Sequence, residues 1–179
     1  MTWTAPEPAP YAKPPRVAGE RESLEGWLDA HRQVVRWKCA GLTEEQLKTP
    51  ANPPSTLTLL GLVRHLADCE RWWFQKIAAG RDVGDVYFTP ERPDADFDDY
   101  ADADPSADLA TFDREVADAR SAVAGLDLDH VVRHPDSGNE LNLRWIYLHM
   151  IEEYARHNGH ADFLREQLDG RTGDFPDGD

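Results

Sequence analysis

The sequence predicts an all-α protein that folds as a four-helix bundle, with a long acidic loop between its second and third helices. Three observations lead to this prediction. Four long stretches repeat apolar residues at the spacing of an amphipathic helix. Segments rich in proline or glycine separate these stretches. The chain has 179 residues, 40% of them hydrophobic, which is enough to bury one sizeable core.

The first helix is expected over residues 20–40, after a proline-rich segment, residues 1–18, that is expected to be extended or disordered. The pattern Thr-Glu-Glu-Gln over residues 43–46 predicts a capping box at the start of a short helical turn. The second helix is expected to begin at Thr56 or Thr58 and to run to Ala79, before Gly80.

Residues 82–108 hold ten acidic residues and one basic residue, Arg92. The spacing Asp94-x-Asp96-x-Asp98 resembles the start of a calcium-binding EF-hand, but the glycine and the glutamate that this motif requires are missing. A solvated acidic loop is therefore expected.

The third helix is expected from Asp104 or Ser106 to Ala124, with Pro105 suited to its first turn. Residues 128–141 are expected to form a loop with a small extended pair. The fourth helix is expected from the cap Asn142 to about Gly170. The expected organisation is thus one bundle domain over residues 19–170, followed by a frayed tail over 171–179.

The fourth helix carries the first sign of a functional site. On a helix of about 100° per residue, four polar side chains fall within about 80° of one another and share this arc with apolar residues: His149, Glu153, His157 and His160. A buried carboxylate must be paired or coordinated, because leaving it bare costs several kcal/mol. Glu153 and His157 are four residues apart, which places both side chains on one face.

His65 lies in the apolar stripe of the second helix, from which it can reach the fourth. His65, Glu153 and His157 together offer two imidazoles and one carboxylate. Three protein ligands that leave open positions are typical of a catalytic zinc site, and nickel, iron or manganese would also fit. The alternative is a hydrogen-bonded network of polar residues in the core.

Composition narrows the class of protein. The net charge of −15 argues against nucleic acid as a partner. No apolar run has the length of a membrane span. Cys39 and Cys69 are the only cysteines and form no disulfide framework, so a reduced, cytoplasmic protein is expected.

Three blocks of sequence carry a family resemblance: Leu-Val-Arg-His-Leu-Ala-Asp around His65, Gly-Leu-Thr-Glu-Glu-Gln-Leu ending at Leu47, and Glu-Glu-Tyr-Ala-Arg-His-Asn-Gly-His-Ala-Asp-Phe-Leu-Arg-Glu ending at Glu166. Over residues 20–170 the chain resembles the DinB-like superfamily. It is most similar to an actinobacterial branch of unknown function related to the mycothiol-dependent maleylpyruvate isomerases.

The resemblance implies a four-helix bundle with one metal held by three side chains, which are often all histidine. Here Glu153 takes one of these positions, as in the maleylpyruvate isomerase branch. His160 stands where many relatives have glutamine, and is expected to support the ligands, to replace one of them, or to shuttle protons. His149, one turn earlier, is expected in the core or beside the ligands.

The implied activity is that of a metal-dependent S-transferase or isomerase that uses a small thiol such as mycothiol and an electrophilic substrate. A homodimer is also expected, since relatives often dimerise. A metal-dependent hydrolase, a non-catalytic metal-binding or stress-associated protein, and a metal-free binder of apolar ligands remain as alternatives.

Overall fold

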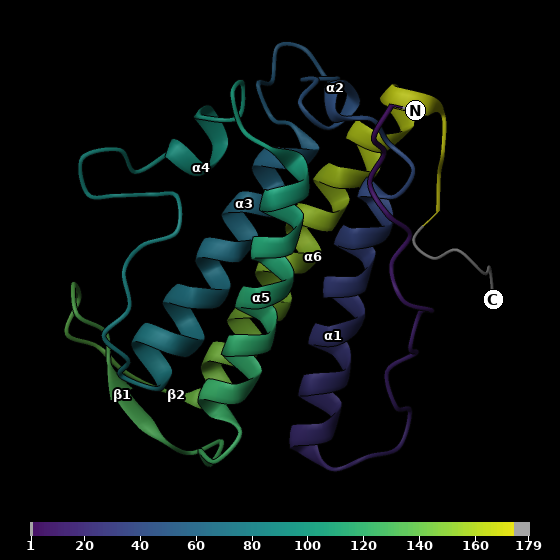
Figure 1. Ribbon diagram of the computed structural model, residues 1–179. Coiled ribbons are helices and arrows are strands. Elements are labelled where there is room, and N and C mark those ends of the chain that lie inside the picture. The colour runs from purple at the N-terminus through teal and green to yellow at the C-terminus, as the bar shows by residue number, and fades with distance from the viewer. Residues whose placement is uncertain (1, 174–179) are drawn as a thin grey trace.

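The computed structural model describes residues 2–173 and confirms the predicted four-helix bundle (Figure 1). The long helices are α1 (Glu20–Cys39), α3 (Leu59–Glu70) with its continuation η1 (Arg71–Ala78), α5 (Pro105–Val123) and α6 (Leu143–Asp169). Shorter elements connect them: α2 (Glu44–Leu47), α4 (Ala95–Asp98) and a hairpin of β1 (Val131–Arg133) and β2 (Glu140–Asn142). In the hairpin, Val132 is paired with Leu141 in antiparallel register.

The core lies between the long helices. Helix α1 packs chiefly against α6, and α3 with η1 packs against α5 and α6. Large apolar side chains from all of them are fully buried, among them Leu28, Leu60, Leu66, Phe112 and Ile146. Burial of each such side chain contributes about 1.5–3 kcal/mol. The predicted apolar stripes therefore meet in one core.

The predicted helix ends are confirmed by their capping contacts. Thr43 and Gln46 form the capping box of α2. The hydroxyl of Thr58 accepts a hydrogen bond from the Gly61 amide at 3.0 Å. The side chain of Asn142 accepts one from the Trp145 amide at 2.9 Å, which starts α6. These side chains satisfy amides that the first helical turn leaves unpaired.

The second long helix differs from the prediction in its last third. An α-helix was expected up to Ala79, but residues 71–78 form the π-helical segment η1. Its wider turns bond each amide to the carbonyl five residues earlier, as the Ala79 amide does to the Phe74 carbonyl at 3.1 Å. The neighbouring residues Trp72 and Trp73 of this segment both line one cavity.

The N-terminal segment is extended over its described part and lies along the bundle (Figure 1). Thr4 forms a β-bridge with Thr43, and the Ala5 amide donates to the Leu42 carbonyl at 2.8 Å. Ala5 itself is buried. Of the expected tail over 171–179, residues 174–179 lie outside the described part of the chain.

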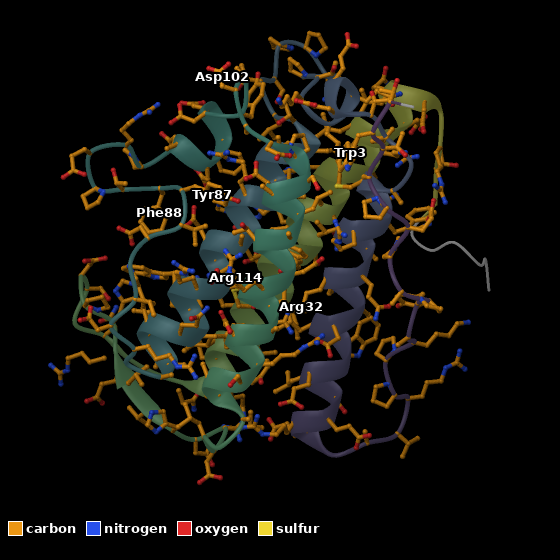
Figure 2. The ribbon with its side chains drawn as sticks, viewed as in Figure 1. Trp3, Arg32, Tyr87, Phe88, Asp102 and Arg114 are labelled. Carbon is orange, nitrogen blue, oxygen red and sulfur yellow. The ribbon has the colours of Figure 1, made fainter. Side chains whose placement is uncertain are left out.

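The acidic loop was expected to be solvated, but parts of it are folded onto α3 and buried. The carboxylate of Asp68 accepts hydrogen bonds from three successive backbone amides, residues 86–88, at 3.1–3.2 Å. Tyr87 and Phe88 thereby lie beside α3 (Figure 2). Further along the loop, Asp96 is only 4% exposed.

Arg64 binds the second half of the acidic loop to α3. Its guanidinium donates to the carbonyl of Asp96 at 3.1 Å and to the carboxylate of Asp108 at 3.3 Å, and it lies over the ring of Tyr87. Only 7% of Arg64 is exposed, so this guanidinium is buried between α3 and the loop. No helix of residues 2–173 is both long enough and apolar enough to cross a membrane.

Candidate metal centre

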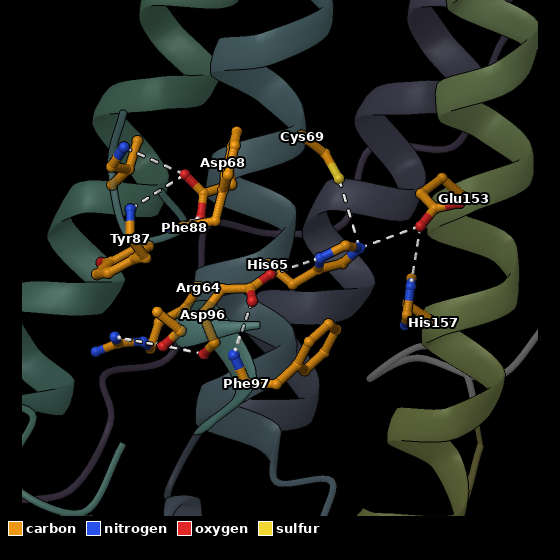
Figure 3. Close-up of polar contacts among 12 residues, drawn as sticks. Arg64, His65, Asp68, Cys69, Tyr87, Phe88, Asp96, Phe97, Glu153 and His157 are labelled. Atoms are coloured by element: carbon orange, nitrogen blue, oxygen red, sulfur yellow. Dashed lines mark hydrogen bonds and ion pairs between the residues drawn. The ribbon is translucent and has the colours of Figure 1, made fainter. Parts of the chain in front are cut away.

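Three side chains converge between two helices, α3 and α6 (Figure 3). His65 comes from α3, and Glu153 and His157 lie one turn apart on α6. Oε1 of Glu153 lies 3.1 Å from Nε2 of His65 and 3.1 Å from Nε2 of His157. One possible ligand atom from each residue lies within 4.8 Å of the other two. The three residues that the sequence predicts as ligands therefore lie together.

This spacing fits a metal ion. In a tetrahedral zinc site with bonds of about 2.0–2.1 Å, neighbouring ligand atoms are roughly 3.3 Å apart. The two distances of 3.1 Å from Glu153 are close to that value. The side chains of His65, Glu153 and His157 are 20%, 15% and 10% exposed, so the centre is sheltered but not closed.

The three groups of the centre shift one another's pKa values. Burial lowers the pKa of His65, but hydrogen bonds with Asp96, Cys69 and Glu153 outweigh it and raise this pKa to about 12. The hydrogen bond from His65 lowers the pKa of Glu153 to about 2 despite burial. Burial and the charge on His65 lower the pKa of His157 to about 4. The positive charge of protonated His65 thus neutralises Glu153, and a bound metal ion would take over this role.

Asp96 is a member of the centre that sequence reasoning missed. Its Oδ2 accepts a hydrogen bond from Nδ1 of His65 at 2.8 Å (Figure 3), and its Oδ1 accepts one from the Phe97 amide at 3.0 Å. Histidine ligands of metals commonly donate their second nitrogen to a carboxylate, which fixes the ring and leaves the other nitrogen free to bind. The only signal in the sequence was the incomplete EF-hand pattern of the acidic loop.

Replacing Asp96 with asparagine is expected to weaken zinc binding by about 10–100-fold, the usual cost of losing a carboxylate behind a histidine ligand. Titration against a chromophoric chelator measures this affinity. Asp98→Asn, an exposed change two residues away, is the matched control and is expected to leave the affinity unchanged. Equal affinities for the wild type and Asp96→Asn would show that Asp96 does not support a ligand.

The two remaining histidines of α6 lie outside the cluster. His160 is exposed rather than part of a buried stripe, and its Nδ1 lies 3.3 Å from Nδ1 of His157. His149 packs against the rings of both Trp73 and Trp145, with centroids 4.6 Å and 5.1 Å away. His160 therefore contacts the predicted ligand His157 from the solvent side. His149 belongs to an aromatic cluster.

A cavity of about 340 Å³ opens beside His65. Its other lining residues come from α3, η1, the acidic loop and the hairpin connection: Asp68, Cys69, Trp72, Trp73, Phe88, Pro93, Asp94, Asp96, Phe97 and Asp136. The sulfur of Cys69 lies here, 3.5 Å from Nε2 of His65. Two other hollows, of about 330 and 460 Å³, lie between α1 and α5 and do not include His65.

Two solved structures share the fold. YfiT from Bacillus subtilis, described as a probable metal-dependent hydrolase with an unusual four-helix bundle topology, is 21% identical, with a TM-score of 0.60 over 86% of this chain and 92% of its own. A conserved protein from Enterococcus faecalis is 17% identical, with a TM-score of 0.58 over 87% of this chain and 100% of its own. The comparison with curated proteins found no match.

The sequence itself matches a family of the DinB-like superfamily, which agrees with the fold and with the resemblance predicted above. The model of the family described as mycothiol S-transferase matches residues 23–170, a span that holds the four long helices, apart from the first three residues of α1, and includes His65, Glu153 and His157. The chain therefore belongs to the mycothiol S-transferase family of DinB-like four-helix bundles.

Proposed function

We propose that the protein binds one divalent metal ion, by preference zinc, through His65, Glu153 and His157. The observation that carries this proposal is the position of Glu153 Oε1, 3.1 Å from one imidazole nitrogen on each side. Two nitrogens and one oxygen suit zinc, while nickel, iron and manganese also accept these ligands. Three protein ligands leave coordination positions for a substrate.

The activity we propose is the transfer of a small thiol, of the mycothiol type, to an electrophilic substrate. A divalent metal at this centre supplies the Lewis acidity that keeps a thiol deprotonated near neutral pH. The sulfur forms a bond to an electrophilic carbon, the leaving group departs with the bonding electron pair, and the thiol proton goes to solvent. Membership of the mycothiol S-transferase family supports this reaction class.

Each residue of the centre has a separate part in this proposal. Glu153 contributes a negative charge, which would make the metal a weaker Lewis acid than three neutral imidazoles would. Asp96 holds the Nδ1 proton of His65, so that Nε2 points into the centre. His160 is exposed and contacts His157 through Nδ1, which suits it to relay the released proton to solvent.

The zinc-loaded protein is expected to join mycothiol to a fluorogenic alkyl halide, and Glu153→Gln is expected to lower the rate by about 100-fold or more, since loss of even an outer partner of a ligand costs 10–100-fold. Fluorescence of the thioether product gives the rate. Glu152→Gln on the same helix is the control, because Glu152 is 53% exposed and faces Arg156. Its rate is expected to match that of the wild type.

Turnover assays with and without thiol distinguish the alternative functions. The fold shared with YfiT, described as a probable metal-dependent hydrolase, makes hydrolysis the second candidate. Turnover of an ester or amide without thiol, lost in Glu153→Gln, would favour hydrolysis over thiol transfer. Bound metal without turnover of either substrate would favour a structural role for the metal.

We also propose that residues 19–170 form the domain that carries this activity, that the protein works in the reducing cytoplasm, and that it forms a homodimer. Cys39 and Cys69 are both free thiols, which agrees with a reducing compartment. Leu148 and Phe163 of α6 are 54% and 64% exposed and support an interface on that helix.

A further inference from the structure

The cavity beside His65 combines aromatic walls with negative charge. Four of its lining residues are aromatic and four are aspartates, and none is lysine or arginine. We infer that the electrophilic substrate of this site is a planar compound that is uncharged or cationic, and that anionic electrophiles are rejected. This inference rests on the proposed function, in which the cavity receives the electrophile.

Two of the aspartates form a charged rim. Asp94, just before α4, and Asp136, in the hairpin connection, are both exposed. Among residues 2–173, neither carboxylate has a hydrogen bond or an ion pair with another side chain. The other two, Asp68 and Asp96, are buried and hold backbone amides and His65. The rim carboxylates are therefore free to meet a ligand, and they repel an anion.

The basic side chains of α3 and η1 are all paired with groups outside the cavity. Arg64 is held by backbone carbonyls and by Asp108. Arg71 forms a bidentate pair with Glu115 on α5, at 2.6 and 2.8 Å. Lys76 pairs with Asp85 and lies over the ring of Trp72, 5.6 Å from its centroid. No lysine or arginine on α3 or η1 is left to neutralise an anionic substrate, and the charge of His65 already faces Asp96 and Glu153.

The aromatic walls favour flat and cationic groups. Trp72 and Trp73 on η1 face the cavity together with Phe88 and Phe97 from the acidic loop. Indole faces attract cations with an energy that grows as water is excluded, and they stack on planar rings. Lys76 over Trp72 shows that an indole of this site already holds a cation. The faces of these rings carry the negative part of the ring quadrupole, so they do not attract an anion.

Three inert probes of the same shape test the inference: benzyltrimethylammonium, benzyl alcohol and phenylmethanesulfonate. Their binding is followed by tryptophan fluorescence, once with metal-loaded protein and once after chelation. The expected order of affinity is ammonium, then alcohol, then sulfonate, in both states. In the double variant Asp94→Asn/Asp136→Asn, the affinity for the ammonium probe is expected to fall about threefold or more. This is the loss expected when two exposed charge pairs are removed.

The control variant is Asp98→Asn/Asp127→Asn, which removes two exposed carboxylates outside the cavity and makes the same change in net charge. It is expected to bind all three probes as the wild type does. Sulfonate binding as tight as ammonium binding, no saturable ammonium binding, or equal losses in the two double variants would overturn the inference. Because the probes neither react nor need the metal, these outcomes are independent of whether the proposed thiol transfer occurs.

Discussion

Zinc affinity is expected to fall by more than about 100-fold when His157 is replaced by alanine, because this removes a ligand itself, whereas loss of an outer partner alone costs 10–100-fold. Burial and the charge on His65 lower the pKa of His157 to about 4, so the ring is neutral at pH 7 and its Nε2 can bind metal. The fold is expected to survive, since the cluster of apolar side chains that joins the long helices is unchanged in this variant. Competition with a chromophoric chelator measures the affinity, and circular dichroism the fold.

His130→Ala is the matched control for this change. His130 is an exposed imidazole just before the hairpin, far along the chain from the centre. Its loss is expected to leave zinc affinity unchanged. If both variants bound zinc equally well, His157 would not be a ligand, and binding by surface histidines would explain any metal in the wild type.

The largest loss of stability is expected for Glu70→Ala, about 3–5 kcal/mol of unfolding free energy, because it leaves a buried arginine without its partner. Glu70 is fully buried and accepts hydrogen bonds from Nε and Nη2 of Arg32 at 2.7 and 2.6 Å. The hydroxyl of Tyr154 donates to the same carboxylate at 2.7 Å. This network joins α1, α3 and α6 in the middle of the bundle. Urea unfolding of the purified variant measures the change.

Two further variants serve as comparisons for Glu70→Ala. Glu140→Ala breaks the exposed pair with Arg133 on the hairpin, and is expected to cost less than about 1 kcal/mol. Arg32→Met/Glu70→Leu removes both charges and is expected to recover a large part of the loss, since burying the pair already costs desolvation. A single Glu70→Ala variant as stable as Glu140→Ala would mean that water reaches the Arg32 side chain.

The helices of this protein could be predicted because their signals are local. Thr43, Thr58, Asn142 and Gly170 mark helix ends by contacts with residues within one turn, and the apolar stripes fix which faces meet. The π-helical turn of η1 could not be predicted in this way. It changes the hydrogen-bonding period within an uninterrupted amphipathic stretch, so the spacing of apolar residues alone does not reveal it.

The three proposed ligands could be placed together from sequence for a similar reason. Glu153 and His157 are one turn apart, and His65 has one facing helix to reach. Asp96 could not, because its contact with His65 depends on the fold of a loop 31 residues away, which Asp68 and Arg64 hold in place. The exposure of His160 depends on which elements cover that side of α6, and a helical wheel does not contain this information.

The central claim is that His65, Glu153 and His157 hold one metal ion, and elemental analysis of the untagged protein tests it most directly. After loading with zinc and gel filtration, we expect about one equivalent of metal in the wild type, and none in His65→Ala with unchanged helical content. If the wild type retained no metal after loading with zinc, nickel, iron and manganese in turn, the claim would be contradicted. The four residues His65, Asp96, Glu153 and His157 would then be a hydrogen-bonded core network with the His65 proton as its only cation.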